Sequence, residues 1–169
     1  MDTIFSLKTN EKFYIIRIGV ENMLEKLDKD MIEAMKNHEK EKLTVIRMVK
    51  ASLKQEEIDH KKEVNEDLLI DVLNRQIKMR KDSISEFEKG GRQDLIDQTQ
   101  SEINILMEYL PEQLSKEEIE EVINRLFEEL KPESQKDMGR VMGQAQSELK
   151  GKADMKEVSN MIREKLEEH

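Results

Sequence analysis

Apolar residues recur every three or four positions from about residue 21 to the end of the chain, and nowhere alternate with polar residues as in a strand. This spacing puts apolar side chains on one face of an α-helix. With 40% charged and only 4% aromatic residues, the chain suits helices whose cores are built from Leu, Ile, Val and Met. Strand-rich folds need more aromatic and β-branched residues. The pattern therefore predicts an all-α protein.

Four helices are expected in the N-terminal part of the chain. The first two span about residues 21–37 and 39–62, with Met31 and Met35 on the apolar stripe of the first. A third begins after Asn65, whose side chain can accept from a free amide of the first turn, and ends at Gly90-Gly91. The fourth stops at Pro111, because a proline disfavours helical backbone in the residue before it.

Three shorter helices follow Pro111. Ser115 and Glu118 have the spacing of a capping box and open a helix that runs to about residue 130. A second helix ends at about residue 149, and Asp154 with Glu157 opens the last one. Three short helices joined by short loops predict a compact bundle.

The predicted organisation has three parts. Residues 1–20 lack helical periodicity, and we interpret them as an extension that is either a product of an upstream start codon or a native tail. Residues 21–110 form a helical N-terminal domain. Residues 111–169 form the compact three-helix C-terminal bundle.

Composition narrows the function classes. The chain has no cysteine, which excludes disulfides, thiolate metal sites and thiol catalysis. No apolar run approaches the ~20 residues that span a bilayer, so we expect no membrane association and a cytoplasmic protein. A formal net charge of -9 argues against broad nucleic-acid binding, and no DNA partner is expected.

The sequence contains few features that are typical of enzymes. No phosphate-binding loop, dinucleotide fingerprint or nucleophile elbow occurs in the sequence. Glu56 and His60 are four residues apart and could share a helix face, but further metal ligands are missing. We therefore expect no cofactor, no metal and no catalytic residue.

Two glycines four residues apart mark the segment 137–143. Gly139 and Gly143 would share a helix face, where a glycine costs about 1 kcal/mol relative to alanine. Without side chains, such a face lets another helix or a nucleic-acid backbone come close. Arg140 on the neighbouring face could meet phosphates. The alternative is simple helix packing, and the physics of the sequence favours that alternative.

A second glycine lies between two cations in the turn after this helix. Lys150 and Lys152 flank Gly151 just before the N-terminus of the last helix, where free amides and the helix dipole suit phosphate. The alternative is that Lys150 compensates the negative end of the preceding helix dipole. These residues taken alone favour the second interpretation.

These two segments together resemble the signature of the GatB/YqeY family, and residues 23–166 as a whole resemble a free-standing YqeY-like protein. Further stretches that carry the resemblance are residues 42–51 and 109–115. The C-terminal bundle is similar to the tail of the GatB subunit of glutamine-dependent tRNA amidotransferases, which recognises tRNA while catalysis occurs elsewhere. This chain departs from that tail at Asp154-Met155, where an asparagine and a proline are usual.

The resemblance implies a non-catalytic accessory module that binds tRNA or another structured RNA beside translation. The alternatives are an adaptor that binds a protein partner in translation, and an accessory to amidotransfer with carbon–nitrogen ligase activity by family association only. The residues that would face RNA are Gly139, Arg140, Met142, Gly143, Lys150, Gly151, Lys152 and Ala153.

Basic residues of the N-terminal helices give a weaker signal. Lys40, Arg47, Lys50 and Lys54 fall on one side of a helix but alternate with glutamates. A second group on the long third helix includes Arg75 and Arg80. We interpret both groups as solvated faces, with an RNA or acidic partner as the alternative.

Overall fold

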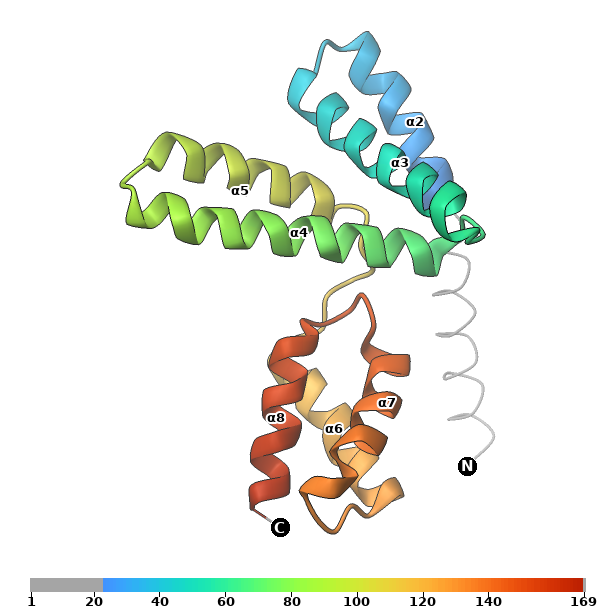
Figure 1. Cartoon of the computed structure of the whole chain (residues 1–169), viewed down its shortest axis with the longest axis vertical. Coiled ribbons are helices and arrows are strands. Elements are labelled where there is room, and N and C mark those ends of the chain that lie inside the picture. The colour runs from blue at the N-terminus through green and yellow to red at the C-terminus, as the bar shows by residue number, and fades with distance from the viewer. Residues whose placement is uncertain (1–22, 169) are drawn as a thin grey trace, which may run out of the picture. The chain divides into compact units, whose positions relative to one another are not determined.

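The computed structural model describes residues 23–168, and in this range it contains seven α-helices, one short 3-10 helix and no strand (Figure 1). The all-α prediction is confirmed. The chain divides into two compact units, Met1–Tyr109 and Leu110–His169. Residues 1–20, expected to be an extension, lie outside the described residues. No helix in the described range is long and apolar enough to cross a membrane.

The described part of the first unit consists of two helical hairpins. Helix α2 (Met23–Lys36) packs on α3 (Lys40–His60), and α4 (Glu66–Lys89) runs alongside α5 (Gln93–Met107) (Figure 1). Helix α3 also contacts α4 and α5, which joins the hairpins. The core at this junction is formed by buried Leu, Ile and Val side chains, among them Ile46, Val49, Leu69, Leu73 and Leu106.

Capping residues mark where these helices begin and end. The Asn65 side chain accepts from the Leu68 amide at 3.0 Å, as predicted. At the end of α4, the Arg92 amide donates to the Phe87 carbonyl and the Gly91 amide to the Glu88 carbonyl. This is a Schellman motif, and it needs a left-handed residue, which Gly91 supplies with φ +63°.

The apolar stripe of α2 differs from the prediction. Leu27 and Ala34 are buried, whereas Met35 is 50% exposed. Successive helical residues are rotated by about 100°, so the side chain that follows buried Ala34 turns away from the core. Met35 was therefore wrongly assigned to the packed face.

The second unit is a three-helix bundle around a continuous apolar core. It consists of α6 (Lys116–Leu130), the 3-10 turn η1 (Gln135–Asp137), α7 (Met138–Leu149) and α8 (Met155–Glu167). The predicted capping box opens α6: the Glu118 amide donates to Ser115 Oγ, and the Ser115 amide donates to the Glu118 carboxylate. The buried core residues are Ile119, Ile123, Leu126, Phe127, Val141, Ala145, Leu149, Val158, Ile162 and Leu166.

Candidate nucleic-acid interface on the C-terminal unit

The turn between α7 and α8 needs its glycine. Lys150 has φ -54° and ψ 123°, and Gly151 has φ 77°, the values of the central residues of a type II β-turn. The Lys152 amide closes the turn by donating to the Leu149 carbonyl at 2.9 Å. A side chain at Gly151 would be strained in this left-handed conformation. Gly151 is also buried, so its first role is to shape the turn.

This turn is bonded to the segment that enters α6. The Gln113 side-chain amide donates to the Gly151 carbonyl at 2.6 Å, and the Leu114 amide donates to the Lys152 carbonyl at 2.8 Å. These bonds satisfy the turn's carbonyl groups and fix its position at one end of the bundle. Both lysines are half-buried, and the bonds from Gln113 and Leu114 fix the backbone of the turn that carries them.

The α7 glycines lie on the open face of their helix. Gly139 and Gly143 are exposed, and a Cβ built at either position meets nothing within 4 Å among the described residues. Ala145 on the same helix is buried in the core. No helix in the described part of the unit packs on the glycines. Helix packing inside the bundle therefore does not account for them.

Two other motif residues face the core. Met142 and Ala153 are partly buried and pack against the apolar cluster of the bundle. Their role in the structure is to hold α7 and the following turn in place. Of the eight residues predicted to contact RNA, these two and buried Gly151 lie behind the surface that the others present.

The basic residues of the motif fall at two ends of α7. Arg140 and Lys150 are ten residues apart on the helix axis, or about 15 Å at 1.5 Å per residue. The Arg140 guanidinium donates to the Asp137 carboxylate at 3.0 Å. The pKa of Asp137 lies below its usual range, mainly because the Glu133 amide donates to it, with Arg140 contributing. The carboxylate therefore stays charged and competes with any phosphate for Arg140.

The N-terminus of α8 is already capped. The Asp154 carboxylate accepts from the Lys156 amide at 2.9 Å, which confirms Asp154 as the capping residue. An acid at this position satisfies a free amide and complements the helix dipole. The helix terminus itself is therefore a poor phosphate site, and the basic residues beside it are Lys150, Lys152 and Lys156.

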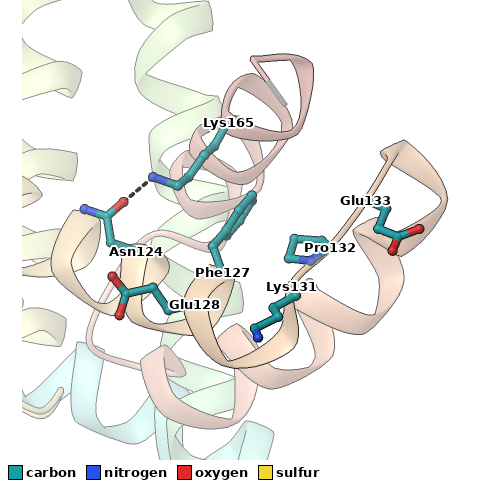
Figure 2. A pocket seen from close by; sticks show the side chains of 7 residues that line it. All are labelled: Asn124, Phe127, Glu128, Lys131, Pro132, Glu133 and Lys165. Atoms are coloured by element: carbon teal, nitrogen blue, oxygen red, sulfur yellow. Dashed lines mark hydrogen bonds between the residues drawn. The ribbon is translucent and has the colours of Figure 1, made fainter.

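A groove at the other end of the bundle carries no signal in the sequence. It has a volume of about 600 Å³ and opens between the end of α6, the loop that follows and α8 (Figure 2). Figure 2 shows Lys165 reaching across to Asn124 above the Phe127 ring. Its residues come from two helices and a loop and share no motif. They are Asn124, Phe127, Glu128, Lys131, Pro132, Glu133 and Lys165.

Several basic residues of the first unit are paired with acids. Lys54 lies 2.7 Å from Glu57, and Lys50 donates to Asp28. Arg80 was predicted to be solvated but is only 8% exposed, and its Nε donates to Glu102 at 2.8 Å. The solvated interpretation is wrong for this residue, because its position on α4 faces both α3 and α5.

Glu56 is the centre of a charge cluster rather than half of a metal site. Its carboxylate lies 2.8 Å from Arg75, 2.9 Å from Lys62 and 3.2 Å from His60 Nδ1. The side chain is 9% exposed, and the hydrogen bonds from Lys62 and Arg75 lower its pKa to about 2. Among the described residues, no group of three or more His, Cys, Asp or Glu side chains is placed to hold a metal ion.

Comparison with known proteins identifies one matching family model and a set of relatives that share one name. A family model described as "Yqey-like protein" matches residues 24–166. "Altered inheritance of mitochondria protein 41, mitochondrial" from Pyrenophora tritici-repentis is 31% identical, over 84% of this chain and 80% of its own length. The proteins of the same name from Kluyveromyces lactis and Lachancea thermotolerans are each 38% identical over 62% of this chain. The match spans 58% of the length of each of these two relatives.

The names of these relatives overturn the predicted cytoplasmic location. All three are named as mitochondrial proteins. The prediction relied on a cysteine-free composition and the lack of a long apolar run. Neither property distinguishes one aqueous compartment from another, so neither could support the location.

Proposed function

The chain belongs to the YqeY-like protein family, and from that premise we propose that its C-terminal unit binds tRNA or another structured RNA as a non-catalytic accessory module of translation. The observation that carries the proposal is the open face of α7. Exposed Gly139 and Gly143 have free space above them; Gly139 directly precedes Arg140, and Gly143 lies between Arg140 and the Lys150–Lys152 turn. The similarity of this bundle to the GatB tail supports the same surface.

The charges of the helices favour α7 over α6 as a surface for RNA. Helix α6 carries six glutamates and two basic residues, so its surface repels a polyanion. Helix α7 carries a single acid, Glu148, and that acid is paired with Arg125 of α6. A backbone can approach closely where side chains are absent, and cations at the two ends of the face can meet phosphates.

Filter binding with total tRNA tests the proposal. We expect the full chain to bind, and Lys150→Glu with Lys152→Glu to abolish binding, since the reversal turns two contacts with phosphates into repulsion. The matched control is Lys54→Glu with Lys89→Glu, which changes the net charge equally on exposed lysines of the first unit. Equal binding by both double variants would reject the site.

Close approach to the glycines has a separate test. Gly143→Leu places a side chain in open space on α7, so it should leave the fold intact and weaken tRNA binding. Gln144→Leu adds the same side chain at the next exposed position as a control. An undiminished affinity of Gly143→Leu would show that RNA does not approach this face.

A protein adaptor is the second candidate, and exposed apolar residues of the first unit favour it. Ile32 and Met35 on α2 are each about half exposed, and Ile58 on α3 is 63% exposed. Large apolar side chains on a surface are typical of protein contacts. Pull-down from lysate with and without RNase distinguishes the candidates: partners retained after RNase indicate protein contacts, and partners lost indicate RNA.

A further inference from the structure

The groove at the far end of the C-terminal bundle contains a cation held by neutral groups. Lys165 is half-buried; its Nζ donates to the Asn124 side-chain oxygen and lies 5.4 Å from the centre of the Phe127 ring (Figure 2). Among the described residues, no carboxylate forms an ion pair with it. A half-buried ammonium with neutral partners has lost part of its hydration, so an anion beside it would be stabilised.

Asn124 fixes the position of the ammonium. Its side-chain oxygen accepts from Lys165, and Figure 2 shows its amide nitrogen on the side away from the ammonium. An ammonium has three hydrogens to donate, so Lys165 can also donate to an oxygen of a carboxylate or phosphate. The ammonium would therefore hold an oxyanion at the α6–α8 side of the groove.

The rest of the groove has an apolar surface and a mixed rim. Phe127 and Pro132 are buried side chains that line it. One lysine, Lys131, and two glutamates, Glu128 and Glu133, complete the lining. The two glutamates would repel a chain of phosphates such as RNA. A ligand with a single anionic group and an apolar body fits this arrangement better.

We propose that this groove is a binding site for a small organic anion, with its carboxylate or phosphate at Lys165 and its flat apolar body against Phe127 and Pro132. The volume of about 600 Å³ is in the range of small-molecule sites. The site is distinct from the proposed RNA surface at the Lys150–Lys152 turn, because Lys165 and that turn lie at opposite ends of α8, which at 13 residues is about 20 Å long.

Titration of the full chain with simple anions, followed by ¹H–¹⁵N NMR, tests the proposal. Benzoate and phenyl phosphate combine both parts of the ligand, acetate and inorganic phosphate supply the charge alone, and benzyl alcohol supplies the ring alone. We expect saturable shifts of the Asn124, Phe127 and Lys165 amides with the aromatic anions, and weaker binding of the other probes. The stronger of benzoate and phenyl phosphate identifies the oxyanion. Equal responses to acetate and benzoate would overturn the apolar subsite.

Lys165→Met tests the ammonium while keeping an unbranched side chain over Phe127. We expect the affinity for the aromatic anions to fall by roughly tenfold or more, as when a hydrogen bond to a charged group is lost. Lys156→Met, an exposed lysine of the same helix, is the matched control. Equal affinities of the two variants, with both spectra still those of a folded protein, would refute the site. Under the proposed function Lys165→Met still binds tRNA, so the two proposals fail independently.

Discussion

At the scale of single residues, the glycines of the C-terminal motif have two different roles. Gly151 is buried in a left-handed conformation that the turn requires. Gly139 and Gly143 have ordinary helical backbone on an open surface, and the fold does not require them. Substitution to alanine distinguishes the two roles. It adds backbone strain at Gly151, whereas it raises helix propensity at Gly139 and Gly143.

Gly151→Ala should destabilise the protein. Left-handed backbone costs a residue with a Cβ about 1–2 kcal/mol, and the turn cannot relax without breaking its bonds to Gln113 and Leu114. Denaturant unfolding monitored by circular dichroism measures the change, with Lys152→Ala as the control in the same turn. If Gly151→Ala has the same free energy of unfolding as the native chain, the turn adopts another conformation.

Gly143→Ala should have the opposite effect. The position is in the interior of α7 and a Cβ there meets nothing within 4 Å, so alanine should stabilise the protein by about 1 kcal/mol. Thermal unfolding should show a higher Tm than that of the native chain. A lower Tm would mean that this face is packed in solution, which would favour a partner helix over RNA.

Residue-level signals in the sequence predicted the helix ends better than the surfaces. Caps such as Asn65 and Ser115 act within one turn of chain, so a local pattern is enough to identify them. Burial depends on which neighbour a helix faces. Sequence spacing therefore could not distinguish Met35 from Ala34, or recognise that Arg80 on α4 faces both α3 and α5. The groove at Lys165 brings together residues 41 positions apart, which no local pattern contains.

At the scale of elements, ion pairs join the helices of the first unit. Glu56 on α3 accepts from Arg75 on α4 and from Lys62 in the connection between them. Tyr109, just beyond α5, donates to Asp30 on α2 at 2.5 Å, and burial together with this bond raises the pKa of the tyrosine. The sequence shows these residues as scattered charges, because their partners lie in other helices.

Glu56 should make the stability of the first unit sensitive to acid. Its pKa is 4.5 without partners and about 2 in the folded protein, so its contribution is complete above about pH 4.5 and is lost as the pH falls towards 2. Glu56→Gln should lower stability at neutral pH and flatten the decline in this window. Denaturant unfolding across the pH range measures both. Parallel pH curves for the native chain and Glu56→Gln would contradict the assignment.

At the scale of the whole molecule, the described chain consists of two units with separate cores. The core of the second unit contains residues of α6, α7 and α8 alone. Periodicity, caps and Pro111 were enough to predict the helices and a compact C-terminal bundle. The packing partners within each unit could not be predicted. An apolar stripe indicates that one face of a helix is buried, but it does not identify the helix that packs on it.

Separate cores should respond separately to mutation. Ile123→Val removes one methyl group from the second unit and should cost about 1 kcal/mol, and Ile46→Val does the same in the first unit. Hydrogen exchange should show faster opening of α6, α7 and α8 in the first variant, and of α3 and α4 in the second. Faster exchange throughout the chain in either variant would show that the units unfold together.

The salt dependence of tRNA binding tests the proposed function most directly. Each phosphate contact contributes about 0.7–0.9 to the slope of log K against log salt concentration. If Lys150 and Lys152 each contact a phosphate, Lys150→Gln with Lys152→Gln should lower the magnitude of that slope by roughly 1.4–1.8. Lys54→Gln with Lys89→Gln should leave it unchanged. A slope that both double variants share with the native chain would contradict an RNA surface on this bundle.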